Sequence, residues 1–193
     1  MVWGVLEPSG FGQFFPCGVF VGHTNPSGDP FRYMSDRGPV DEEQEPRVFR
    51  IERGGRTLAA WIMVRNGLLL VAREVRAVIE RVEPEVHQFW PMEVVYPNGD
   101  RTAHDYHAMV IRQFRDAVIE ERSEVTRFNG RPSCHATKAG VRGLTLCAER
   151  IGDAHLWRDT RLLGASIFMS DALQSAIAET GLKIMPHART GVA

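Results

Sequence analysis

Residues 68–84 read LLLVAREVRAVIERVEP, an apolar run followed by a segment with a different periodicity. The first part, Leu68 to Val71, has the length and composition of a short β-strand. The second part carries apolar residues at the spacing of a helix with one core-facing stripe: Val75, Val78, Ile79 and Val82. Pro84 cannot continue this helix. The stretch therefore predicts a strand that leads directly into a helix.

A similar pattern returns 98 residues later. Ile167 to Met169 has strand character, Ser170 is a favoured N-cap, and Asp171 would lie in the first helical turn. Gly181 is expected at the C′ position of this helix. The buried stripe is predicted at Leu173, Ala176 and Ile177. Two short units can match this well by chance, so coincidence and duplication both stay open.

Glycine turns divide the sequence before residue 68. Gly54-Gly55 lies between two β-prone segments, Val48 to Ile51 and Leu58 to Val64, and predicts a hairpin. Asn66-Gly67 signals a second turn directly before the apolar run.

The sequence after residue 84 alternates between β-prone segments and turns. Gln88 to Tyr96 is aromatic and β-branched, and the Pro97-Asn98-Gly99-Asp100 sequence that follows tolerates a tight hairpin turn. The segment from Ala103 to Ile119 fits either a helix or a strand, and the sequence leaves this open. Phe128 to Gly143 is expected to be an exposed excursion, after which Leu144 to Ala148 resumes as a strand.

Residues 1–46 are rich in Gly, Pro, Ser and Asn, so we expect a loop-rich N-terminal section. Val2 to Leu6 and Cys17 to Val21 could add edge strands to a sheet formed later in the chain. Residues 47–193 would form the core. The pattern as a whole predicts an α+β fold with a mixed, mainly antiparallel sheet, two or three helices, and a single domain over residues 1–193.

Composition narrows the classes of function. The 193 residues contain 23 Lys and Arg against 24 Asp and Glu, so no excess of positive charge supports nucleic-acid binding. Three widely spaced cysteines, Cys17, Cys134 and Cys147, favour reduced thiols in a cytoplasm over a disulfide framework. The N-terminal residues lack the pattern of a signal peptide, and no apolar run is long enough to span a bilayer. We therefore expect a cytoplasmic protein without membrane contact.

Two short constellations could support catalysis. His104, Asp105 and His107 could converge on a metal ion or act as acid and base, although solvated polar residues after a turn have the same pattern. Cys134-His135 could form an activated thiol, but adjacent side chains rarely point at each other. Signatures of phosphate loops, zinc proteases and nucleophile elbows are missing from the sequence, so we expect no cofactor and no enzyme. A small Cys/His or metal-dependent hydrolase is the alternative.

Five residues are the candidates for contact with a partner. Trp157 and Arg158 belong to the residue types that dominate binding hot spots, although a tryptophan in a strand usually packs in the core. Glu42, Glu43 and Glu45 could steer a basic partner, although such a run is more often a solvated loop. A third class of function, a structural subunit of a larger assembly, stays open beside binding and catalysis.

The order and spacing of five stretches resemble a bacterial family of polymorphic-toxin immunity proteins, the eleventh of such families and formerly a domain of unknown function. The stretches are Gln88 to Val94, Glu121 to Glu124, Ala154 to Arg158, Ile167 to Leu173 and Thr180 to Leu182. The resemblance covers residues 60–193, and Ala72 departs from it, since a capping serine like Ser170 is expected there. It implies a cytoplasmic protein that binds and neutralises a cognate toxin protein, without catalytic residues or a cofactor.

Overall fold

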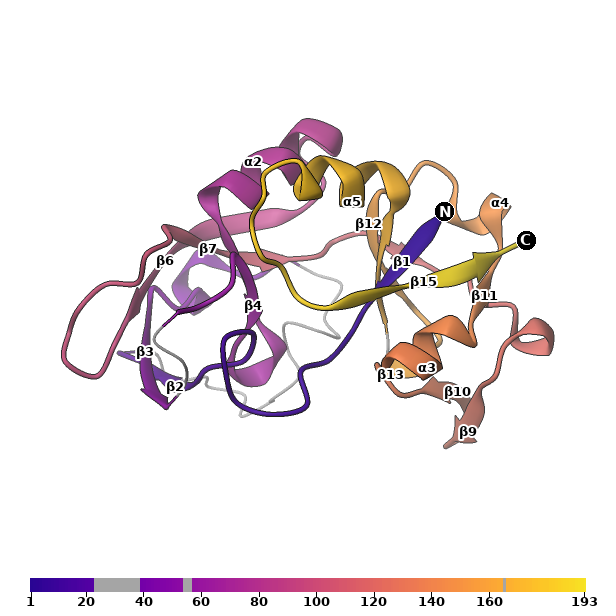
Figure 1. Ribbon diagram of the computed structural model, residues 1–193, viewed down its shortest axis with the longest axis horizontal. Coiled ribbons are helices and arrows are strands. Elements are labelled where there is room, and N and C mark those ends of the chain that lie inside the picture. The colour runs from indigo at the N-terminus through magenta and orange to yellow at the C-terminus, as the bar shows by residue number, and fades with distance from the viewer. Residues whose placement is uncertain (23–38, 54–56, 165) are drawn as a thin grey trace. The chain divides into compact units, whose positions relative to one another are not determined.

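The computed structural model describes residues 1–22, 39–53, 57–164 and 166–193. The chain forms two compact units, each built from several segments (Figure 1). Unit 1 contains Met1–Glu7, Gln113–Glu179 and Met185–Ala193, and unit 2 contains Pro8–Arg112 and Thr180–Ile184. Because the chain passes from one unit to the other more than once, neither unit is a continuous segment. The expectation of one domain over residues 1–193 stays a prediction.

The described part of unit 2 contains a six-stranded sheet and a ten-residue α-helix. Its strands follow the order β2-β3-β6-β7-β5-β4. Their bounds are β2 (Cys17–Phe20), β3 (Val48–Arg53), β4 (Trp61–Met63), β5 (Leu69–Ala72), β6 (Gln88–Val95) and β7 (Tyr106–Val110), joined by 3-10 turns η1 (Glu42–Gln44) and η2 (Arg65–Gly67) and by helix α2 (Arg73–Val82). One face packs into a core that includes Phe49, Ile51, Ile62, Leu70, Trp90 and Ala108.

The predicted strand and helix after residue 68 are present. β5 leads directly into α2, whose Val75, Val78 and Ile79 are buried, and the helix ends at Val82 ahead of Pro84. The turn at Asn66-Gly67 has positive φ at both residues, 62° and 71°, and joins the antiparallel strands β4 and β5. Gly99, with φ 87°, lies in the turn between β6 and β7. The open segment after Ala103 forms strand β7, not a helix.

The hairpin predicted across Gly54-Gly55 is wrong. β3 pairs with β2 and, in parallel, with β6, whereas β4 pairs with β5. In this arrangement Phe49 and Ile51 of β3 are buried in the core of unit 2. Residues 54–56 themselves lie outside the described part of the chain.

Helix α2 is tied to β7 at both ends. At its start, the Arg73 N–H donates to the carbonyl oxygen of Asp105 at 2.9 Å. At its end, Glu83 pairs with His87 at 2.9 Å, and the N–H of Arg112 donates to the other imidazole nitrogen of His87 at 3.3 Å. Both His87 and Glu83 are buried, so the accepting Nδ1 leaves Nε2–H to donate to the carboxylate. The helix N-terminus is thereby fixed beside β7.

Unit 1 contains a second six-stranded sheet and a small three-stranded one. The large sheet has the order β11-β15-β1-β14-β12-β8, and the small one β13-β10-β9. The strands are β1 (Val2–Val5), β8 (Phe114–Arg115), β9 (Thr126–Phe128), β10 (Arg131–Cys134), β11 (Thr145–Leu146), β12 (Leu156–Asp159), β13 (Leu163–Gly164), β14 (Ile167–Ser170) and β15 (His187–Val192), with η3 (Glu120–Arg122), α3 (Lys138–Arg142), α4 (Ala148–Ile151) and α5 (Asp171–Ala178).

Unit 1 corrects three expectations and confirms one. β1 is not an edge strand, because it lies between β14 and β15 and pairs with both. Residues 128–143 are not a simple excursion, since they include the β9–β10 turn and α3, which buries Val141. The predicted cap of α5 is present: the Ser170 hydroxyl accepts a hydrogen bond from the Leu173 N–H at 3.1 Å. Gly181 has φ 69° but is not the predicted C′ residue, because the C-cap is Glu179 and Gly181 therefore lies one residue beyond C′.

The α+β class with mixed, mainly antiparallel sheets is confirmed. α2 and α5 are the two longer helices, and α3 and α4 are single turns. Within the described ranges, no helix combines the length and apolar character needed to cross a membrane.

The two large sheets share one arrangement over five strands. In unit 2 these strands are β3-β6-β7-β5-β4, and in unit 1 they are β11-β15-β1-β14-β12, with the same sequence of parallel and antiparallel pairings. A helix leaves the fourth strand directly in both.

The residue pairings in the two sheets agree as well as the strand order. Tyr106 of β7 pairs with Ala72 and Met92. Val2 of β1 pairs with Ser170 and Thr190, which lie 98 residues after Ala72 and Met92. β1 therefore takes the place of β7, although it precedes its neighbours in the chain. This agreement favours a duplication with a circularly permuted second copy over coincidence.

We expect the central position of β1 to make Gly4 intolerant of a side chain. A Cβ atom there would lie 2.7 Å from Cγ1 of Val141 and 3.3 Å from Cε1 of Phe168, and both of these side chains are buried. Gly4→Ala should lower the free energy of unfolding by about 1–3 kcal/mol, because the packed core must shift. Urea denaturation measures this. Gly10→Ala is the control, since no atom lies within 4 Å of its Cβ position, and equal midpoints for the two variants would contradict the packing.

Candidate functional site

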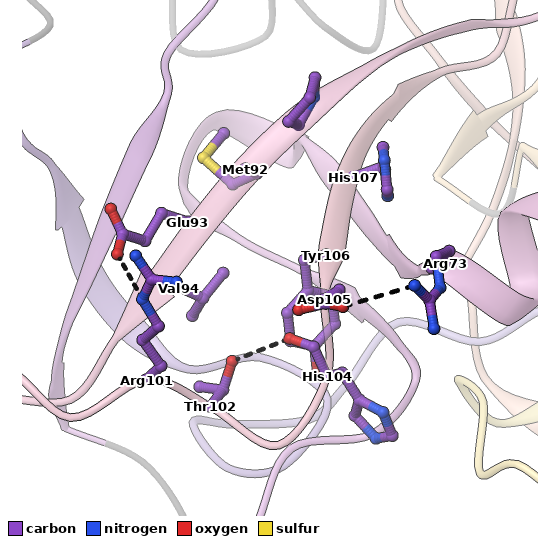
Figure 2. Close-up of a pocket in the computed structure, with 11 residues that line it drawn as sticks. Arg73, Met92, Glu93, Val94, Arg101, Thr102, His104, Asp105, Tyr106 and His107 are labelled. Atoms are coloured by element: carbon purple, nitrogen blue, oxygen red, sulfur yellow. Dashed lines mark hydrogen bonds and ion pairs between the residues drawn. The ribbon is translucent and has the colours of Figure 1, made fainter.

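A pocket of about 430 Å³ lies in unit 2 where β6, β7 and the first residue of α2 meet (Figure 2). It is lined by Arg73, Pro91, Met92, Glu93, Val94, Arg101, Thr102, His104, Asp105, Tyr106 and His107. Three of these residues, His104, Asp105 and His107, were predicted as a candidate constellation. The others are Arg73 of α2, Pro91 to Val94 of β6, Arg101 and Thr102 between β6 and β7, and Tyr106 of β7.

Residues from both faces of the β6–β7 pair contribute to the lining of the pocket. Met92 and Tyr106 are paired across β6 and β7 and are both buried in the core of unit 2. Pro91 and His107, the next pair, therefore lie on the opposite face. The Tyr106 side chain is anchored in the core, where its hydroxyl donates a hydrogen bond to the Ala59 carbonyl at 2.6 Å. Burial raises the pKa of this hydroxyl.

An irregularity in the hairpin brings two residues to the rim. Val95 is bridged to Arg101, and Met92 is paired with Tyr106. The chain therefore advances by three residues from Met92 to Val95 but by five residues on the opposite side, from Arg101 to Tyr106. The extra residues carry His104 and Asp105 outward, with the Thr102 hydroxyl bonded to the His104 carbonyl at 3.3 Å. This loop forms one side of the pocket (Figure 2).

Charges of both signs surround the opening. The Arg101 guanidinium lies 2.9 Å from the Glu93 carboxylate, and Arg73 lies 4.0 Å from Asp105. These side chains are largely exposed, so each pair stabilises the fold by less than about 1 kcal/mol. Two cations and two anions leave the rim without a net charge when the histidines are neutral.

His107 differs from the rim residues in its environment. It is half-buried, and desolvation, followed by the nearby Arg76, lowers its pKa. Its Nδ1 is buried and has no hydrogen-bond partner within the described ranges. A neutral imidazole with an unpaired nitrogen can donate or accept one hydrogen bond from an incoming group.

The catalytic readings of the sequence gain no geometric support. His104 and His107 lie apart in Figure 2, with Asp105 and Tyr106 between them. In the described part of the chain, no three His, Cys, Asp or Glu side chains are grouped as a metal site.

The Cys134-His135 pair also lacks the geometry of a catalytic dyad. Cys134 is buried and its thiol donates to the His135 carbonyl at 3.3 Å, while the His135 side chain is exposed. Burial raises the pKa of this thiol, which disfavours the thiolate.

The predicted contact residues divide into buried and exposed ones. Trp157 is 0% exposed and stacks on Phe168 with ring centroids 5.9 Å apart, and Arg158 is 3% exposed. Burial also lowers the pKa of Arg158 to about 10. These positions argue against Trp157 and Arg158 as surface contacts, because their strand β12 is packed in the core.

The acidic residues behave differently. The Glu45 side chain is 9% exposed, pairs with Arg47 at 2.7 Å and accepts a hydrogen bond from Gln88 at 3.1 Å, which gives it a structural role. Glu42 is 90% exposed at its side chain and Glu43 is also exposed. Contact between these two residues and a partner stays a prediction.

Sequence reasoning missed Arg73, Pro91, Glu93 and Arg101. The turn at residues 97–100 indicated a hairpin, but its register depends on the extra residues before β7, and nothing in the sequence marks them. Arg73 joins the site only because α2 is tied to Asp105.

The buried thiol generates a prediction about reactivity. In variants that retain a single cysteine, Cys134 should react with a disulfide reagent at pH 7.5 about tenfold more slowly than Cys17 or Cys147, which are both partly exposed. Absorbance of the released thiol gives the rates, and the three should become equal in denaturant. A fast reaction of Cys134 in the native protein would support the interpretation that Cys134 is a nucleophile.

Similarity to a known protein family extends over most of the sequence. No curated protein matches the chain at a significant level. The model of the immunity protein family Imm11 matches residues 16–190 of the 193. This match includes both sheets except β1 and the last residues of β15. The chain belongs to the Imm11 immunity protein family.

Proposed function

We propose that this chain neutralises a cognate bacterial toxin by binding it directly in the cytoplasm, without catalysing a reaction. Membership of the Imm11 immunity protein family is the observation that carries the proposal. The partner is a toxin protein, and the balance of 23 basic against 24 acidic residues gives no support to a nucleic acid.

The contact surface is proposed to include the pocket of unit 2. Its rim offers exposed arginines beside apolar and aromatic groups, a combination that is enriched where proteins bind one another. Glu42 and Glu43 are proposed to steer the partner's approach, because their carboxylates are exposed to solvent. The hydrolase alternative is weaker, since Cys134 is buried and the two histidines of the pocket diverge.

Stoichiometry separates binding from catalysis. The toxin encoded beside this chain should kill a sensitive host when expressed alone and spare it when this chain is co-expressed. With purified proteins, toxin activity should fall linearly and vanish at about one equivalent, and the two chains should elute together by size exclusion. Inactivation by far less than one equivalent would indicate an enzyme. A fully active toxin and no complex would contradict the proposal, and a non-cognate toxin is the control.

Charge reversal tests the acidic contact residues. We expect Glu42→Lys with Glu43→Lys to slow association with the toxin roughly tenfold at low salt, because electrostatic steering is lost. The difference should shrink at high salt. Stopped-flow fluorescence measures the rates, and Glu121→Lys with Glu149→Lys, at exposed acidic residues of η3 and α4, is the control with the same change in net charge. Equal rates for both variants would exclude Glu42 and Glu43 from the contact.

A further inference from the structure

The pocket of unit 2 has an equivalent position in unit 1. His107 pairs with Val71 on one side and Pro91 on the other. Trp3 pairs with Met169 and Arg189, which lie 98 residues after Val71 and Pro91. α2 and α5 begin in the same way. The Arg73 N–H donates to the Asp105 carbonyl at 2.9 Å, and the Asp171 N–H donates to the Met1 carbonyl at 3.0 Å. Trp3 in unit 1 therefore corresponds to His107 in unit 2.

In unit 1 this position is filled by the chain's own indole. Nε1–H of Trp3 donates to the Asp171 carboxylate at 3.0 Å, and the Arg189 guanidinium lies 4.8 Å above the ring centroid. The His187 ring contacts the indole edge-on at 5.2 Å. A carboxylate at the start of the helix and an arginine on the adjacent strand thus hold one aromatic side chain.

In unit 2 the same position is open. A smaller imidazole replaces the indole, and Pro91 replaces Arg189. Arg73, 98 residues before Asp171, replaces the carboxylate at the start of the helix. A pocket of about 430 Å³ is present, which lies within the range of roughly 300–1,000 Å³ that ligand sites occupy. Asp105 supplies a carboxylate at the rim, and Arg73 and Arg101 supply guanidinium groups (Figure 2).

The chemistry of the pocket selects its occupant. The rim has no net charge with neutral histidines, so it does not favour a strongly charged group. Pro91 and the His107 ring offer flat surfaces for stacking, and a guanidinium from Arg73 or Arg101 can cover an aromatic face as Arg189 covers Trp3.

We propose that this pocket receives an exposed tryptophan side chain of the partner protein, at the position that Trp3 fills in unit 1. The inference rests on the proposed function for the identity of the partner as a toxin. It adds the place of contact and the residue type that the toxin must present. One side chain buried in this way is typical of a binding hot spot.

Filling the pocket from within tests the proposal. His107→Trp should place an indole where unit 1 already accepts one, and should weaken toxin binding by at least about tenfold with an unchanged circular dichroism spectrum. His135→Trp is the matched control, because His135 is exposed and lies in unit 1. Arg101→Glu, at a side chain that is 81% exposed, is the second variant if His107→Trp does not fold, and it should also weaken binding.

The outcomes distinguish this inference from the proposed function. If wild-type protein binds the toxin and His107→Trp and Arg101→Glu bind equally tightly, the pocket is not the contact, and immunity by binding still stands. If the wild type binds no toxin, the proposed function fails, and N-acetyl-tryptophanamide becomes the probe. Amide shifts around the pocket in a nuclear magnetic resonance titration, absent in His107→Trp, would then support the pocket's chemistry, and no shifts would overturn it.

Discussion

The architecture depends on one strand in each unit that is hydrogen-bonded on both sides. β7 lies between β5 and β6, and β1 lies between β14 and β15, all antiparallel. Such a strand satisfies the backbone groups of two neighbours as well as its own, and buried backbone groups without partners are costly. The helix on each sheet is attached to the same strand, through Arg73 and Asp105 in one unit and Asp171 and Met1 in the other. Both the pocket and its filled equivalent are therefore built on this strand.

Local structure could be predicted from the sequence because short-range physics determines it. The stripe of α2, the Ser170 cap and the Asn66-Gly67 turn depend on neighbouring residues, and the structure contains all three. Strand partners depend on residues far apart in the chain. The Gly54-Gly55 hairpin failed because β3 pairs with β6, and β1 was placed at an edge because its partners are more than 160 residues away.

The site was predictable in part. His104, Asp105 and His107 attracted attention through their chemistry, and all three line the pocket. Their spacing on a strand does not bring them together, so the metal reading finds no support there. Trp157 and Arg158 were suggested as contacts by their residue types alone, and the structure buries both of them in β12. Arg73 and the extra residues before β7 complete the pocket. Their positions depend on tertiary contacts, which the periodicity of the sequence does not encode.

The position of β1 constrains how the protein forms during synthesis. Residues 2–5 are synthesised more than 160 residues before their partners Phe168 to Ser170 and His187 to Thr190. Unit 2 can assemble most of its strands in the order of translation, whereas unit 1 must keep its central strand unpaired until those partners have been translated. Closing so long a loop is slow, and the waiting strand offers two open edges to other nascent chains. Chaperone contact with this segment would protect it at the stage when it is most prone to aggregate.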